Sequence, residues 1–146
     1  KRGEIYSYRN VGKALTQGAE MEIEWKPLRY LFGAVRYTYL RTKDKETGKE
    51  FIYSPHHRAN VEISCSIKRL GLSVTLVEEY VGARFEDKEN RKKLPSYLLT
   101  HLMVNQSISK KGSLFLTINN LFGTRYEEIF SSEEGIKFKT GLTFKF

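Results

Sequence analysis

Apolar and polar residues alternate with a period of two along most of this chain, and this pattern constrains the fold more than any other feature. In the segment EMEIEW, Met21, Ile23 and Trp25 fall on one side and Glu20, Glu22 and Glu24 on the other. Successive side chains of an extended strand point to opposite faces, so such segments predict strands with one apolar and one polar face. The alternation recurs in the segments 30–41, 59–68, 72–80, 96–108, 113–120 and 135–146, and partly near Ile5–Arg9. We therefore predict about eight strands.

Length, hydropathy and charge exclude several classes of protein. The 146 residues suit one domain. No apolar run approaches the roughly 18 residues of a membrane helix, which leaves a membrane barrel of alternating strands open. The formal net charge is +8, but acids and bases are mixed and no basic helix is present, so we expect no nucleic-acid partner. Cys65 is the single cysteine and cannot form an internal disulfide.

Short and long connections between the predicted strands alternate strictly. The short ones are KPLR, RLG and KKG, and the long ones cover residues 42–57, 83–95 and 123–134. In an up-and-down antiparallel sheet, successive connections fall on opposite ends, so one rim should carry tight turns and the other long loops. Outer-membrane barrels have this asymmetry. We predict an all-β, antiparallel, up-and-down transmembrane β-barrel, with residues 1–146 forming a single barrel segment.

Aromatic residues on the apolar face favour the membrane barrel over a soluble barrel with an apolar interior. The soluble barrel explains the alternation equally well, but it explains less well why rings collect at strand ends. We expect two membrane girdles, one near the short turns with Trp25, Phe144 and Phe146, and one toward the long loops with Tyr37, Tyr39 and Tyr80.

Several segments, in order and at the right spacing, resemble the late barrel of TonB-dependent outer-membrane receptors. The resembling segments are NVGKALTQGAEMEIEW, YTYL, SPHHRANVEIS, EEYVGARF, LPSYLLTHLMV, INNLFGTRYEE and the terminal alternating strand. One departure is that Ile136 and Lys137 follow Gly135 where the family often has Gly-Arg before its last strand. The resemblance covers almost the whole chain and implies the C-terminal barrel segment of a receptor of the siderophore or cobalamin type.

The resemblance implies a role in TonB-dependent uptake of a metal chelate or a cobalamin-like nutrient across the bacterial outer membrane, without enzymatic activity. Family members have about twenty-two strands and a plug domain, so we expect this chain to be roughly the last third of the barrel. Expected partners are outer-membrane lipid, the barrel-assembly machinery, the metal-chelate ligand and TonB, the last only through a plug outside this chain. The alternative is a self-contained eight-stranded barrel with a structural or adhesive role. A barrel enzyme and a soluble lipid-binding barrel are further hypotheses.

The expected site residues follow from these hypotheses. Ligand contacts are predicted in the long loops at Tyr53, Arg84, Arg91 and Tyr126, because aromatic rings and guanidinium groups provide stacking area and charge-assisted bonds. The resemblance implies that Phe146 and its strand are the assembly signal. We expect no catalytic residue, cofactor or metal.

Three other motifs receive structural interpretations. The stripe Glu20, Glu22 and Glu24 indicates a wet barrel wall paired with basic residues across strands rather than a cation site. His56 and His57 are adjacent on an extended segment and should point apart, which disfavours a shared metal. Asn119 and Asn120 are typical of a transition from strand to loop.

Overall fold

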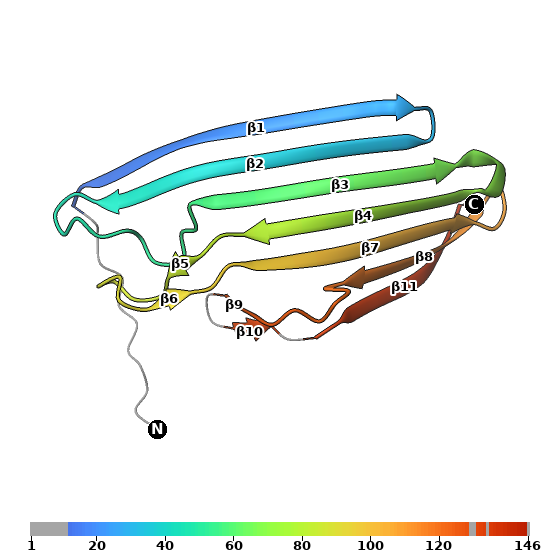
Figure 1. Ribbon diagram of the computed structural model, residues 1–146. Coiled ribbons are helices and arrows are strands. Elements are labelled where there is room, and N and C mark those ends of the chain that lie inside the picture. Colours follow the sequence, from blue (N-terminus) through green and yellow to red (C-terminus); the bar gives the residue numbers. More distant parts are fainter. Residues whose placement is uncertain (1–11, 129–130, 134, 146) are drawn as a thin grey trace, which may run out of the picture.

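Long antiparallel strands make up most of the protein. The computed structural model describes residues 12–128, 131–133 and 135–145 (Figure 1). Within these residues, seven strands form one sheet in the order β1-β2-β3-β4-β7-β8-β11, and all neighbours are antiparallel. Their bounds are β1 Ala14–Leu28, β2 Leu31–Asp44, β3 His57–Ile67, β4 Leu72–Val81, β7 Tyr97–Ser107, β8 Gly112–Asn119 and β11 Lys137–Phe144. The predicted strand near Ile5–Arg9 and the residue Phe146 lie outside the described residues.

The predicted alternation of short and long connections is confirmed. The turns β1–β2, β3–β4 and β7–β8 lie at one end of the sheet, and the long loops lie at the other (Figure 1). The β3–β4 turn is a 3-10 helix, η1 (Lys68–Leu70), which Gly71 ends at φ 63°. That left-handed backbone favours glycine. The long loops hold two short ribbons, β5 (Arg84–Phe85) with β6 (Lys93–Leu94), and β9 (Tyr126–Glu128) with β10 (Ser131–Glu133).

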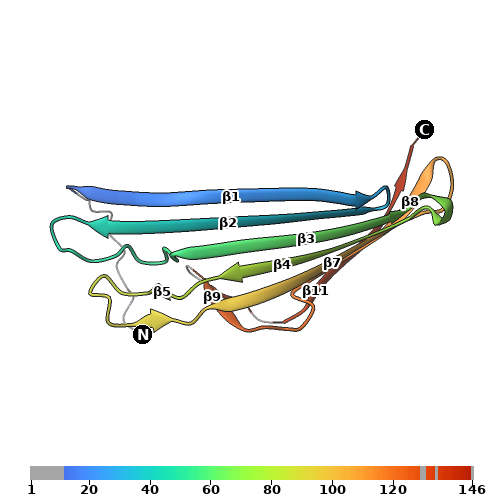
Figure 2. The same ribbon diagram turned by 45° about the horizontal axis from the view of Figure 1, so that its top comes forward.

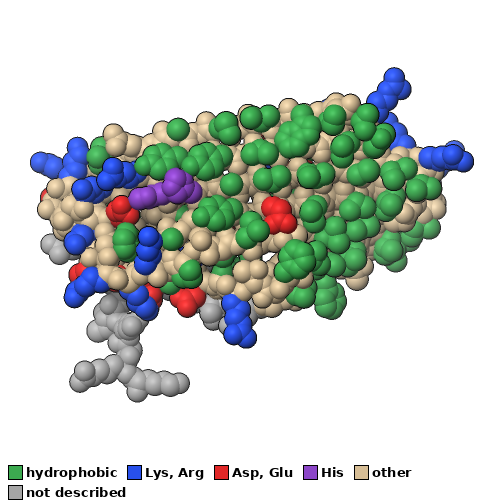
Figure 3. Space-filling view, in the orientation of Figure 1, with side chains coloured by type: hydrophobic (Ala, Val, Ile, Leu, Met, Phe, Trp, Pro, Cys, Tyr) green, Lys and Arg blue, Asp and Glu red, His purple; other side chains and the backbone are tan. Residues whose placement is uncertain are grey.

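Strand register places the apolar residues of neighbouring strands on one face. Met21, Tyr37, Ala59, Tyr80 and Leu98 form one continuous row across five strands. The adjacent row on the opposite face is Glu22, Arg36, Asn60, Glu79 and Leu99. The sheet curls so that β11 turns behind the other strands (Figure 2), and the face seen in Figure 3, rich in hydrophobic side chains, is its convex face. The two-faced strands predicted from the alternation are therefore confirmed.

The apolar residues of the convex face do not pack into an interior. Ile23 is 51% exposed and Leu98 is 50% exposed. The buried apolar cluster is small and lies on the concave face, where Val81, Tyr97 and Leu99 pack together under Tyr126. An exposed apolar face of this kind marks a surface that contacts lipid or another protein, and it is consistent with the membrane hypothesis.

The sheet is open in the described part of the chain. β1 and β11 are its two edge strands and do not pair with each other. The all-β, antiparallel, up-and-down barrel fold is confirmed. The seven strands do not close on themselves within these residues, which agrees with the predicted segment of a larger barrel rather than with the alternative of a self-contained eight-stranded barrel. No helix among them is long and apolar enough to cross a membrane.

Glu78 interrupts the apolar convex face. It lies between Val61 and Thr100 in register, two residues from Tyr80 on the same face. Thr100 is buried and its hydroxyl donates a hydrogen bond of 2.8 Å to Oε1 of Glu78. The second carboxylate oxygen is buried and has no hydrogen-bond partner among the described residues. One hydroxyl therefore compensates only part of the desolvation of this carboxyl group.

Two adjacent residues of β7 test the orientation of the sheet. Val104 is on the convex face and Asn105 is on the concave face. We expect Val104→Arg to lower the free energy of unfolding in lipid vesicles by about 2–4 kcal/mol if the site lies near the bilayer midplane. The matched Asn105→Arg should change it far less, because its side chain enters the aqueous side. Equal losses in the two variants, measured by denaturant titration in vesicles, would contradict this orientation.

Candidate functional site

The long loops at one end of the sheet are fastened to one another. The backbone N–H of Tyr53 donates to the carbonyl of Phe85 at 2.7 Å. The Asn90 amide makes a reciprocal pair with Glu50, accepting from its N–H at 2.7 Å and donating to its carbonyl at 3.0 Å. These bonds join the β2–β3 loop to the β4–β7 loop, so the two loops form one continuous rim.

Arg84 joins the third long loop, which connects β8 to β11, to this rim. Its side chain donates to the carbonyl oxygen of Pro95 at 3.4 Å and to that of Glu127. The guanidinium carbon lies 5.1 Å from the centre of the Tyr97 ring, and Tyr97 packs against Tyr126 at 4.7 Å between ring centres. Arg84 is only 5% exposed. A buried guanidinium held by carbonyls and an aromatic face positions neighbouring segments.

A cavity of about 230 Å³ opens beside Arg84. Its lining comes from two loops and from the start of β7: Arg84, Leu94, Pro95, Ser96, Tyr97, Arg125, Tyr126 and Glu127. The cavity combines aromatic rings and guanidinium groups with one carboxylate. Such a set can stack on a planar group and donate charge-assisted hydrogen bonds to an anionic one.

The structure brings together two of the four predicted ligand residues. Arg84 and Tyr126 line the same cavity, whereas Tyr53 and Arg91 are not part of its lining. Tyr53 adopts φ 55° in the β2–β3 loop, and Arg91 is exposed in the β4–β7 loop. Ligand contact stays a prediction for all four residues.

Two residues of the β1 glutamate stripe, Glu22 and Glu24, are paired with a basic residue of the neighbouring strand, as expected. The Arg36 guanidinium lies 2.5 Å from Glu22, 3.7 Å from Glu24 and 3.8 Å from Glu62. All four side chains are partly exposed on the concave face, so each ion pair contributes little stability. The network makes this part of the concave face polar and charged.

The histidines have separate partners. The His57 Nδ1 is 2.7 Å from the Tyr37 hydroxyl, while His56 Nε2 is 3.1 Å from Glu50. The two rings are 6.3 Å apart and inclined at 72°. His101 lies beside Asn119 at 3.2 Å. Across residues 12–128, 131–133 and 135–145, no group of three or more His, Cys, Asp or Glu could hold a metal ion.

Asn120 organises the exit from β8, in agreement with its predicted structural role. It is buried, adopts φ 55°, and donates to the carbonyls of Thr124 at 2.8 Å and Gly135 at 3.1 Å. Its side-chain oxygen accepts from the Thr124 N–H. Asn90 has a similar role but was not predicted, because its partner Glu50 is 40 residues away and no local pattern marks the pair.

The predicted girdle residues lie on the convex face at its two ends. Trp25 is opposite Gly33 near the short turns, and its ring fills the space that a β-carbon on Gly33 would occupy. Phe144 lies at the same end, opposite Gly112. Tyr37, Tyr39 and Tyr80 lie on the half nearer the long loops, where Tyr39 is 5.4 Å from His57 between ring centres. Their role as membrane girdles stays a prediction.

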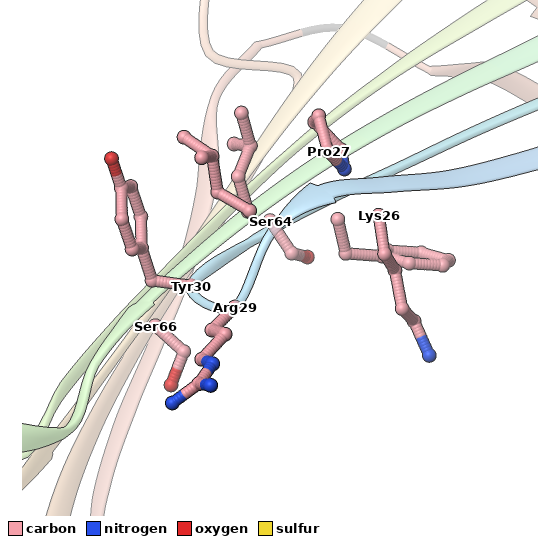
Figure 4. Close-up of a pocket in the computed structure, with 9 residues that line it drawn as sticks. Lys26, Pro27, Arg29, Tyr30, Ser64 and Ser66 are labelled. Atoms are coloured by element: carbon pink, nitrogen blue, oxygen red, sulfur yellow. The ribbon is translucent and has the colours of Figure 1, made fainter.

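A second cavity lies at the short-turn end. It has a volume of about 510 Å³ and is lined by Lys26, Pro27, Leu28, Arg29, Tyr30, Leu31, Phe32, Ser64 and Ser66. Lys26, Arg29 and Ser66 extend to one side of the sheet, while Tyr30 extends to the other (Figure 4). The amino group of Lys26 lies 5.5 Å from the centre of the Phe32 ring.

Replacing Arg84 should release the third loop. In Arg84→Met the carbonyls of Pro95 and Glu127 lose a charged donor, whose hydrogen bonds contribute about 1.5–3 kcal/mol each. We expect trypsin to cleave after Arg125 at least about tenfold faster, since the local opening free energy falls. Lys88→Met, an exposed change in the neighbouring loop, is the control. An unchanged cleavage rate in Arg84→Met would remove its positioning role.

Asp87 should make the order of the β4–β7 loop depend on pH. The backbone N–H of Lys92, together with the N–H and charge of Arg91, lowers the pKa of the Asp87 carboxyl below its ordinary value of 3.8. A depressed pKa means that the ionised form stabilises the loop. This order is complete at neutral pH and is lost only as the pH falls below 3.8 through the lowered value.

Amide hydrogen exchange of residues 86–93 measures this effect. Asp87→Asn should give fast exchange already at neutral pH and abolish the acid transition, because the amide cannot accept as a carboxylate does. Glu89→Gln, an exposed change in the same loop, should retain the transition. Persistence of the transition in Asp87→Asn would assign it to another group.

The sequence of this chain is similar to that of known receptors. The family described as TonB dependent receptor-like, beta-barrel matches residues 2–121. The Ferrioxamine B receptor of Salmonella typhimurium is 30% identical over 135 residues, covering 82% of this chain. The chain spans 19% of the length of that relative.

Solved structures with a similar fold include two receptors and a copper transporter. A mutant ferric enterobactin receptor from Pseudomonas aeruginosa has a TM-score of 0.78 at 23% identity over 94% of this chain, which corresponds to 23% of that protein. The ferric yersiniabactin uptake receptor from Yersinia pestis has a TM-score of 0.76 at 19% identity, covering 94% and 24% of the two chains. A copper transporter has a TM-score of 0.77 at 15% identity, covering 91% and 24%. The family model matches most of the chain, and the open two-faced sheet agrees with it. The chain therefore belongs to the β-barrel family of TonB-dependent receptors.

Proposed function

We propose that this chain forms part of the barrel wall of an outer-membrane receptor that takes up a ferric siderophore with energy supplied through TonB. The observation that carries the proposal is the curved sheet, whose convex face is apolar and whose loops gather at one end. Membership of the receptor family supports the same conclusion. The relatives named for ferrioxamine and enterobactin suggest an iron chelate, and a cobalamin-like ligand has no comparable support.

The proposal gives the wall and the loops different tasks. The convex face contacts outer-membrane lipid, and the concave face with its Arg36–glutamate network borders an aqueous interior. The long loops meet the ligand through the four predicted residues Tyr53, Arg84, Arg91 and Tyr126. Arg84 holds the loops in place, because its guanidinium is buried against Tyr97 and two carbonyl groups. The ligand passes without covalent chemistry.

The other partners belong to the same proposal. The terminal strand ending at Phe146 would be recognised by the barrel-assembly machinery, and TonB would be reached through a plug domain outside residues 1–146. The alternative, a self-contained eight-stranded barrel with a structural or adhesive role, would need β1 and β11 to meet, which they do not in the described sheet.

Iron uptake in cells tests the proposal. The full reading frame that contains this chain is expressed in an iron-starved bacterium without other siderophore receptors. Uptake of radioactive iron is then measured, and ferrioxamine B, enterobactin or cobalamin is added as the competitor in separate assays. We expect uptake that disappears when TonB is deleted. Uptake that persists without TonB, or competition by cobalamin alone, would reject the proposed transport or its ligand class.

A matched pair of variants tests the loop contacts. Arg91→Ala should weaken ligand binding by about tenfold, the size expected for one charge-assisted hydrogen bond. Lys88→Ala removes the same charge from the same exposed loop and should leave binding unchanged. If both variants weakened ligand binding equally, the loss would be due to the overall positive charge of the loop and not to a contact of Arg91.

A further inference from the structure

Each short turn combines cations with an exposed aliphatic side chain. Leu28 is 47% exposed beside Arg29, Leu70 is 59% exposed beside Lys68 and Arg69, and Ile108 is 64% exposed near Lys110 and Lys111. We call these residues the short-turn collar: Leu28, Arg29, Lys68, Arg69, Leu70, Ile108, Lys110 and Lys111. The same pairing of cations with an exposed aliphatic residue therefore recurs at all three short turns.

Acidic residues are missing from the sequence around the short-turn collar. The stretches 25–35, 63–77 and 102–126, which contain the three turns and the strand ends around them, hold no Asp or Glu. Among the residues that the structure places, no carboxylate lies within ion-pair distance of a collar cation. The long loops mix both signs, as in the Lys92–Glu86 pair at 2.7 Å. Within the described residues, the cations of the short-turn collar therefore have no carboxylate partner.

The position of the short-turn collar relative to the aromatic rings points to a lipid surface. Trp25 and Phe144 lie at the same end on the convex face, just before the turns. The three hairpins are neighbours in the sheet, so their turns are spaced by two strands each, or about 10 Å. Tyr30 extends to the side of the sheet opposite to Arg29 (Figure 4). An aliphatic tip, a neighbouring ring and adjacent cations are the combination that binds an anionic membrane surface.

We propose that the short-turn collar binds the headgroups of anionic phospholipids in the leaflet at this end of the sheet. Arg29, Lys68, Arg69, Lys110 and Lys111 contact the phosphate groups, and the three aliphatic tips enter the boundary between headgroups and acyl chains. This inference rests on the proposed function, because it requires the convex face to lie in a bilayer. An acidic protein segment would satisfy the cations but would leave the aliphatic tips without a reason.

Lipid selectivity of the full-length protein tests the inference. The protein is reconstituted in phosphatidylcholine vesicles that contain spin-labelled phosphatidylglycerol or spin-labelled phosphatidylcholine with identical chains, and the relative association constant is measured by electron paramagnetic resonance. We expect a preference for the anionic label that salt weakens. In the triple variant Lys68→Gln, Lys110→Gln, Lys111→Gln the preference should fall at least about fivefold, the effect of roughly one surface cation at the headgroups.

A second triple variant of equal charge is the control. Lys45→Gln, Lys49→Gln, Lys88→Gln removes three exposed lysines from the long loops and should retain the preference. Equal losses in both triple variants, a preference that survives in the short-turn variant, or displacement of the lipid label by soluble polyglutamate would overturn the inference. Leu70→Ser with Ile108→Ser should weaken association of both labels, and no change there would remove the role of the aliphatic tips.

The outcome separates this inference from the proposed function. A protein that fails to insert into neutral phosphatidylcholine vesicles contradicts the membrane location itself. A protein that inserts but shows equal association of the two labels contradicts only the short-turn collar.

Discussion

The requirement that backbone N–H and C=O groups be paired inside an apolar environment determines most of this structure. A chain whose convex face is apolar cannot leave these groups unpaired where lipid covers it, and the antiparallel ladder satisfies them strand by strand. The continuous register from β1 to β11 meets this requirement in the interior of the sheet. Irregular backbone is accordingly confined to the two ends, and the edges β1 and β11 need further partners.

The two ends of the sheet differ in physical character as well as in length. At the long-loop end, charges of both signs form local pairs, and buried polar groups such as Arg84 and Asn120 hold irregular backbone in place. At the other end, the turns are tight, uniformly basic and tipped with aliphatic residues. This polarity is consistent with one end that recognises a solute and another that rests against a surface, as the two proposals state.

The sequence predicted the sheet well because its signals are local. Alternation in segments such as EMEIEW and the order of short and long connections identify strands, faces and ends without knowledge of tertiary contacts. The loops were less predictable. Arg84 and Tyr126 were selected by residue type alone, and their shared cavity with Tyr97 depends on how two loops fold over β7. The Asn90–Glu50 pair and the placement of Glu78 beside Thr100 likewise depend on long-range register, which residue patterns do not encode.

The packing of Trp25 on Gly33 gives the protein a built-in optical probe. The chain contains a single tryptophan, and its ring lies over a glycine of the adjacent strand at the short-turn end. Among residues 1–146 it is the only indole, so within this segment the intrinsic fluorescence reports on one hairpin alone. Emission wavelength and quenching by brominated lipids would give the depth of that hairpin, and with it the vertical placement of this part of the wall.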